Sequence, residues 1–66
     1  MDKKKIGTRL RSLRAERTLE EVAKDVGIST SALGMYETGR RIPTDDTKVL
    51  LARYYKSSVE SIFYAS

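Results

Sequence analysis

The sequence predicts an all-α fold in which five short helices pack into one domain. Apolar residues recur at helical spacing along most of the 66 residues, and no segment shows the alternation typical of a strand. Helix start and stop signals separate these apolar groups at short intervals. Since so short a chain forms one domain, residues 1–66 are expected to be a single unit without a linker or repeat.

The first helix is expected over about Lys3 to Arg17. Ile6, Leu10 and Leu13 stand at i, i+4 and i+7 with basic residues between them, which predicts an amphipathic helix with one apolar stripe. Residues 1–17 carry seven basic side chains and two acidic ones, so their net charge is +5.

The second helix begins with a capping box. The Thr18 hydroxyl is expected to accept a first-turn N–H while the Glu21 side chain reaches back to Thr18. Gly27 is expected to stop the helix, because the residue after a helix commonly needs a positive φ. The buried face is predicted to consist of Val22, Ala23 and Val26.

The third helix is predicted to follow the N-cap Ser29 and to run to Thr38, before Gly39. Ala23 offers a small side chain where the second and third helices cross, and Gly27 tolerates the tight turn between them. Two helices joined in this way form a helix-turn-helix unit, expected here over about residues 18–38. The residues that pin the third helix across the second are Ile28, Leu33 and Tyr36.

The last two elements follow a proline. Pro43 disfavours helix immediately before it, and Thr44 is expected to cap a fourth helix that runs through Tyr55. A final short turn is predicted to start at Ser57 or Ser58 and to hold Val59, Ile62 and Phe63.

Composition excludes several classes of function. The chain has no Cys and no His, which rules out disulfides, thiol catalysis, Ser-His-Asp chemistry and zinc-finger sites. No enzyme activity, metal or cofactor is therefore expected. The longest apolar run, Val49 to Ala52, is far too short to span a bilayer, and no signal peptide is visible. We therefore expect a cytoplasmic protein.

The net charge of +4 points to a polyanionic partner, either nucleic acid or an anionic membrane surface. The alternative is a solvated charged face without a partner. A membrane role is disfavoured because the apolar stripe of the first helix is needed to close the core and cannot also enter lipid.

Nearly the whole chain, from Ile6 to Phe63, resembles a known family. The matching segments are Ile6-Gly7, Leu10-Arg11, Leu13-Arg14, Glu21-Val22-Ala23, Gly27-Ile28-Ser29, Tyr36 to Pro43 and Ser58 to Phe63. They resemble the XRE family of helix-turn-helix repressors, the Cro-like regulators of phages and bacteria. The resemblance implies a five-helix, lambda-repressor-like domain that binds a palindromic operator in duplex DNA as a homodimer, with the third helix in the major groove.

The resemblance also assigns roles to individual residues. It places Thr30, Ser31, Gly34 and Met35 at base edges. By charge and position, phosphate contacts are expected from Arg40 and Arg41 after the third helix, and next from Arg9 and Lys3 to Lys5. Arg17 and Ser29, beside the starts of the second and third helices, are further expected phosphate contacts. None of the base-facing residues is charged, so readout would depend on short hydroxyls, thymine-methyl contacts and DNA shape. The chain departs from the family at Leu19, where many members have a Gln that holds a phosphate.

Two further expectations concern packing. By resemblance, Arg14 should form an ion pair with Glu37. The fourth helix and the last turn carry more apolar surface than the core requires, which predicts a dimer interface. Its expected residues are Leu50, Tyr54, Ile62, Phe63 and Tyr64.

A protein-binding regulatory module is the alternative function, since antitoxins and related regulators reuse this fold to contact a protein partner. A steep salt dependence of duplex binding would favour the DNA-binding regulator. Salt-insensitive binding to a protein would favour the alternative.

Overall fold

The all-α fold is confirmed by the computed structural model, which describes residues 1–66 and contains no strand. The fourth helix ends one residue before the predicted Tyr55, and the last turn is π-helical. The elements are α1 (Lys3–Arg14), α2 (Leu19–Val26), α3 (Thr30–Glu37), α4 (Asp45–Tyr54) and the turn η1 (Glu60–Tyr64).

Side-chain oxygens begin all four α-helices. Thr18, Ser29 and Thr44 accept the N–H groups of the residues three positions on, at 3.0, 3.0 and 3.3 Å, which confirms the predicted caps. The complete capping box at Thr18 and Glu21 is also present. Asp2, which we did not predict as a cap, accepts the N–H groups of two lysines in the first turn of α1.

The first helix is shorter than predicted. The prediction that it continues to Arg17 is wrong, because the backbone leaves the helix at Ala15, where φ is 53°. The Arg17 guanidinium turns back and donates to the carbonyls of Leu13 at 2.8 Å and Arg14 at 3.4 Å. An arginine head thus satisfies C-terminal carbonyls that have no partner within the helix.

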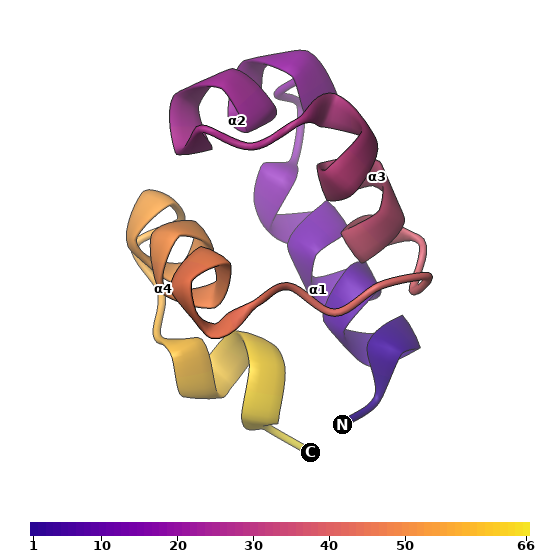
Figure 1. Cartoon of the computed structure of the whole chain (residues 1–66). Coiled ribbons are helices and arrows are strands. Elements are labelled where there is room, and N and C mark those ends of the chain that lie inside the picture. The colour runs from indigo at the N-terminus through magenta and orange to yellow at the C-terminus, as the bar shows by residue number, and fades with distance from the viewer.

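The helices enclose one core (Figure 1). In this view α1 runs along α3, α2 crosses one end of them, and α4 with η1 closes the opposite side near both termini. None of the helices combines the length and apolarity needed to cross a bilayer. The buried apolar residues are Ile6, Leu10, Val22, Ala23, Leu33, Tyr36, Leu51, Ala52, Ile62 and Phe63.

The contact between α1 and α3 depends on Gly7. A Cβ atom at this position would lie 2.8 Å from the carbonyl carbon of Glu37 and 2.9 Å from the carbonyl oxygen of Tyr36. Both neighbours are backbone atoms, which cannot rotate away. Gly7 therefore allows the first turns of α1 to approach the C-terminal end of α3 closely.

Candidate nucleic-acid interface

The turn between α2 and α3 is tight and fully hydrogen-bonded. Gly27 has a φ of 89°, and its N–H and that of Ile28 both donate to the carbonyl of Ala23, at 2.9 and 3.0 Å. This is the left-handed stop expected from the sequence. Ala23 itself is 1% exposed, so its small side chain lies between the two helices. The local geometry is that of a helix-turn-helix unit.

One face of α3 is fixed in the core and the other is free. Leu33 and Tyr36 point inward, with exposures of 0% and 6%. The expected base-reading residues lie around the rest of the helix, where Thr30 and Ser31 are exposed and Gly34 and Met35 are half-buried. No atom lies within 4 Å of the place where a Cβ of Gly34 would stand, so internal packing does not require this glycine.

Three residues that flank α3 and are expected to contact phosphates have accessible donor groups. Arg40 and Arg41, which follow α3, are exposed, and their side chains have no hydrogen-bond or ion-pair partner. The Ser29 oxygen accepts the N–H of Ala32, and its hydroxyl proton remains free to donate to a phosphate.

Arg17 makes contacts within the fold that were not predicted. Its guanidinium carbon is 5.2 and 5.3 Å from the ring centroids of Tyr54 and Tyr55, and its nitrogens donate to carbonyls of α1. Cation–π contacts of this kind hold the guanidinium inside the fold. The phosphate contact expected of Arg17 stays a prediction; within the fold its side chain joins α1 to α4.

The structure brings Arg14 and Glu37 together. Nε and one terminal nitrogen of the guanidinium donate to the two carboxylate oxygens at 2.8 and 2.9 Å, and the side chains are only 13% and 6% exposed. The hydrogen bonds that Arg14 donates to Glu37 raise the pKa of Arg14, although desolvation opposes them. This bidentate pair ties the last residue of α3 to the last residue of α1.

The Tyr55 hydroxyl is buried without a hydrogen-bond partner. Burial, with a smaller contribution from the Glu37 carboxylate, raises the pKa of Tyr55 to about 12. This phenol is neutral at physiological pH.

The expected dimer interface is only partly exposed. Ile62 and Phe63 are each 2% exposed and belong to the core, so their assignment to an interface is corrected. Tyr54 is half-buried, and its hydroxyl donates to Asp25 at 2.9 Å. Leu50 and Tyr64 are 44% and 55% exposed and remain available to a partner.

Tyr64 is held by a buried lysine. The Lys48 ammonium donates to the Tyr64 hydroxyl at 3.0 Å and to Asp45 at 3.4 Å, and it lies 5.0 Å from the Tyr64 ring centroid. The bonds to Tyr64 and Asp45 raise the pKa of Lys48 against the opposing effect of burial. Lys48 thereby fixes η1 against α4.

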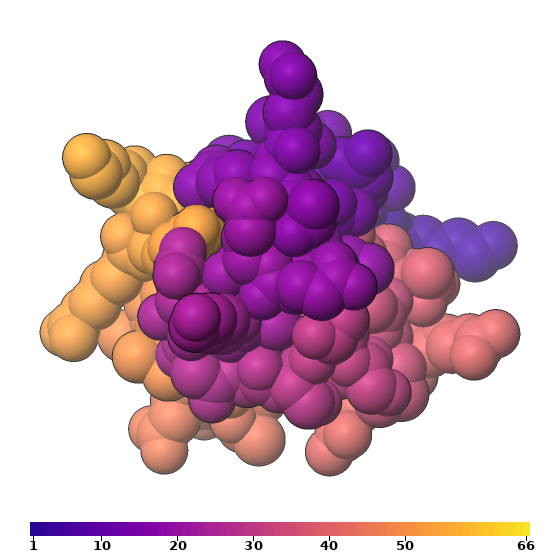
Figure 2. Space-filling view, turned by 90° about the horizontal axis from the view of Figure 1, so that it is seen from above, coloured from indigo at the N-terminus to yellow at the C-terminus, as the bar shows by residue number.

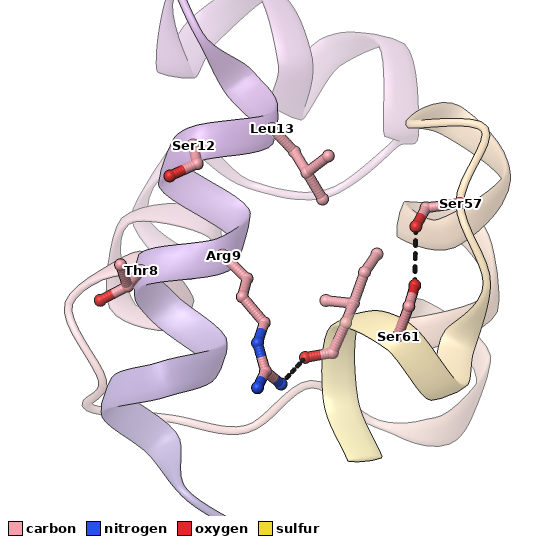
Figure 3. A pocket seen from close by; sticks show the side chains of 7 residues that line it. Thr8, Arg9, Ser12, Leu13, Ser57 and Ser61 are labelled. Carbon is pink, nitrogen blue, oxygen red and sulfur yellow. Dashed lines mark hydrogen bonds between the residues drawn. The ribbon is translucent and has the colours of Figure 1, made fainter. Parts of the chain in front are cut away.

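A hollow of about 320 Å³ lies between α1 and η1 (Figure 3). Arg9 crosses one side of it and donates to the carbonyls of Ile62, Ala65 and Ser66 at 2.9 to 3.1 Å. The sequence feature that could have predicted these contacts is the position of Arg9 on the same helical face as Leu13. No part of the chain gathers three side chains able to ligate a metal ion. The lining residues are Thr8, Arg9, Ser12, Leu13, Ser57, Ser61 and Ile62.

Comparison with known families agrees with this geometry. Residues 5–61 match the family described as "Helix-turn-helix domain", and the chain belongs to this family. Over 56 residues it is 43% identical to the HTH-type transcriptional regulator YobD of Bacillus subtilis (strain 168). The aligned region covers 82% of this chain and 50% of that relative, so the chain spans about half the relative's length. No solved structure matches the chain.

Proposed function

We propose that this chain is the duplex-DNA-binding domain of an XRE-type transcriptional regulator and that α3 enters the major groove. The free outer face of α3 carries the proposal. Its inner face is fixed by Leu33 and by the Glu37–Arg14 pair, so the free side chains are presented on a rigid helix. The name of the Bacillus relative, a transcriptional regulator, supports the same class.

Base readout in this proposal uses small groups. The hydroxyls of Thr30 and Ser31 can donate to or accept from base edges, and Met35 can contact a thymine methyl group. Gly34 leaves open space, which lets the helix backbone approach the floor of the groove. Because none of these side chains is charged, DNA shape is expected to contribute much of the specificity.

We further propose that two copies bind a palindromic operator and act as a repressor. Half-sites one DNA turn apart would place the two α3 helices roughly 34 Å from each other. The exposed side chains of Leu50 and Tyr64 lie on α4 and η1, and this apolar surface supports association there.

Selection of bound duplexes from a random DNA pool, followed by salt titration of binding, tests the proposal. Replacing Arg40 or Arg41 with Ala should weaken binding to all sequences about equally and lower the log–log salt slope by roughly 1 each. Lys24→Ala on α2 is the control, since this exposed lysine is not assigned a phosphate. A lost base preference with an unchanged slope would contradict the role of both arginines.

Specificity is tested separately on α3. Substituting Ser31 or Met35 should change the preferred bases at one or two positions, by about 1–3 kcal/mol per site. An unchanged preference in both variants would remove α3 as the reading helix. If no duplex is selected and the chain binds a protein without salt dependence, the antitoxin-like alternative is favoured.

A further inference from the structure

We infer that Arg9 is a positioning residue for operator binding: it fixes the orientation of the helix that reads the bases relative to the surface that pairs two copies. This inference rests on the proposed function, in which α3 enters the major groove and α4 with η1 joins the copies. Arg9 lies on α1, between these two parts of the molecule.

The reading helix and the pairing surface lie on different sides of the molecule. In Figure 1, α3 lies to the right of α1, and α4 with η1 lies to its left. Seen from above, atoms of the orange segment at the end of α4 project at the left edge, and those of the indigo N-terminal segment project at the right edge (Figure 2). In a two-fold dimer, the orientation of these two sides therefore determines where the second α3 lies on the duplex.

The helices α1 and α3 form one rigid unit, which we call the reading unit. Gly7 brings the backbone of α1 against that of Glu37 at the end of α3. Arg14 donates two hydrogen bonds to the Glu37 carboxylate at 2.8 and 2.9 Å, and both side chains are largely buried. A close backbone contact and a bidentate ion pair leave α3 little freedom to move against α1.

The helix α4 and the turn η1 form the second unit, which we call the pairing unit. The Lys48 ammonium is buried and donates to the Tyr64 hydroxyl at 3.0 Å and to Asp45 at 3.4 Å. This contact fixes η1 on α4. The exposed side chains of Leu50 and Tyr64, which carry the proposed dimer surface, therefore belong to the same unit.

Arg9 is the polar link between the two units. Its guanidinium donates to the carbonyls of Ile62 at 2.9 Å, Ala65 at 2.9 Å and Ser66 at 3.1 Å, and the bond to Ile62 is drawn in Figure 3. Of the hydrogen bonds and ion pairs in the chain, those of Arg9 alone connect α1 or α3 with α4 or the C-terminal turn.

Apolar packing alone does not hold the units in one orientation. The hydrophobic effect is non-directional, and a hollow of about 320 Å³ interrupts the packing between α1 and η1 beside Arg9. A planar guanidinium that donates to three carbonyls fixes both a distance and an angle. Arg9 therefore supplies the directional contact that the packing lacks.

The spacing of the operator half-sites is the property that this link controls. One base pair added between the half-sites moves them about 3.4 Å apart and turns them by about 34° around the duplex axis. A dimer whose reading and pairing units are rigidly joined discriminates against this change. A dimer whose units rotate against each other accommodates it.

The test measures spacing preference in the variant Arg9→Lys. Lysine keeps the charge and most of the stem but lacks the planar fork that reaches three carbonyls. The palindromic operator selected with the wild-type chain is compared with the same operator carrying one base pair more or less at its centre. The wild type should prefer the selected spacing about tenfold, and Arg9→Lys less than about threefold. Arg9→Gln, whose amide reaches fewer carbonyls, is a second variant with the same expected loss.

Arg11→Lys is the matched control. Arg11 lies on the same helix, and its guanidinium donates only to the Ala15 carbonyl four residues on, so this variant should keep the wild-type preference. The ratio of two affinities in one protein cancels any direct contact of residue 9 with a phosphate, because the half-sites are identical. A merely structural role of Arg9 would lower the melting temperature and leave this ratio unchanged.

Two results would overturn the inference while binding of the operator still supports the proposed function. The first is a folded Arg9→Lys chain with the wild-type spacing preference. The second is a wild-type dimer that binds all three spacings equally well. A wild-type chain that selects no duplex, or only single half-sites, would reject the palindromic operator itself and the inference with it.

Discussion

At the scale of single residues, arginines with the same formal charge have opposite roles in this chain. Three guanidinium groups donate hydrogen bonds to carbonyls or a carboxylate of the fold, those of Arg9, Arg14 and Arg17. The side chains of Arg40 and Arg41 are instead exposed to solvent. A guanidinium offers five donors on a long stem, so sequence position alone does not say which acceptor it will find. For this reason the contacts of Arg17 with Tyr54 and Tyr55 were not predicted.

Removing one member of the Arg14–Glu37 pair is expected to destabilise the fold, whereas replacing both members with apolar residues is not. Arg14→Met leaves the Glu37 carboxylate nearly buried without its partner, which should cost about 3–5 kcal/mol in the free energy of unfolding. The double variant Arg14→Met/Glu37→Leu should recover most of that loss, because neither charge remains stranded. Urea unfolding followed by circular dichroism measures both, and a double variant no more stable than Arg14→Met would contradict the interpretation.

Tyr55 should make the fold sensitive to alkaline pH. Its pKa is about 12 in the folded chain against an ordinary 10.0, so the unfolded chain loses the proton first. The resulting stability is complete below pH 10 and is lost as the pH rises from 10 to 12. The full pKa difference corresponds to roughly 3 kcal/mol, which solvent screening at a half-buried ring reduces to about 1 kcal/mol.

Tyr55→Phe isolates this effect from the other groups that titrate at high pH. The variant should lose about 1 kcal/mol less than the wild type between pH 9 and pH 12. At pH 7 it should be at least as stable, because the hydroxyl it lacks has no partner. Parallel pH profiles of the urea midpoint in the two proteins would show that Tyr55 is not the group responsible.

At the scale of the elements, two glycines occupy helical positions for different physical reasons. Gly34→Ala fills open space and should stabilise the fold by about 0.5–1 kcal/mol, because alanine is the better helix former. If α3 approaches a groove closely, the same change should weaken duplex binding about tenfold, or about 1.4 kcal/mol. A more stable variant with unchanged DNA affinity would remove close approach as the reason for Gly34.

Gly7→Ala is the matched substitution in α1. Its Cβ would collide with the Glu37 and Tyr36 backbones, so α1 and α3 would have to separate. We expect a loss of about 1–3 kcal/mol despite the gain in helix propensity. Thermal melting of the two alanine variants compares them directly, and a stabilised Gly7→Ala would contradict the close contact.

The elements that the sequence predicted best are those determined by local chemistry. The caps at Thr18, Ser29 and Thr44 and the stop at Gly27 depend on neighbouring residues alone, and all four were predicted. The contact of Arg17 with Tyr54 of α4, by contrast, is long-range and does not follow from neighbouring residues. Helical periodicity places Lys48 on the buried face of α4 with Leu51, but its hydrogen-bond partner Tyr64 is sixteen residues away and does not follow from periodicity.

At the scale of the whole molecule, only part of the candidate site could be predicted. Residues on α3 follow from helical spacing once Leu33 and Tyr36 are assigned to the core. The contact of Gly39 with Lys4 joins segments 35 residues apart and appears only when α1 and α3 are packed together. The same packing decides which apolar residues near the C-terminus stay exposed and available to a partner. Ile62 and Phe63 are buried and so are not among them.

The surface left for a dimer is small but rigid. Leu50 and Val49 on α4 are 44% and 40% exposed, and Tyr64 on η1, whose hydroxyl accepts from Lys48, is 55% exposed. A standard interface buries about 800 Å² per partner, which is nearly a fifth of the 4277 Å² surface of this chain. Two-fold pairing of this apolar patch would use the same residues on both copies.

Leu50→Glu should therefore abolish dimerisation without unfolding the chain. Leu50 lies outside the core, so the circular dichroism spectrum should remain unchanged, while a charge placed in the centre of a two-fold interface meets its own copy across the axis. Lys24→Gln changes the net charge by the same amount on α2 and should leave the dimer intact. Sedimentation equilibrium at micromolar concentration measures all three proteins. A wild-type chain that sediments as a monomer there, with a duplex affinity that Leu50→Glu does not alter, would show that α4 and η1 do not pair two copies either in solution or on DNA.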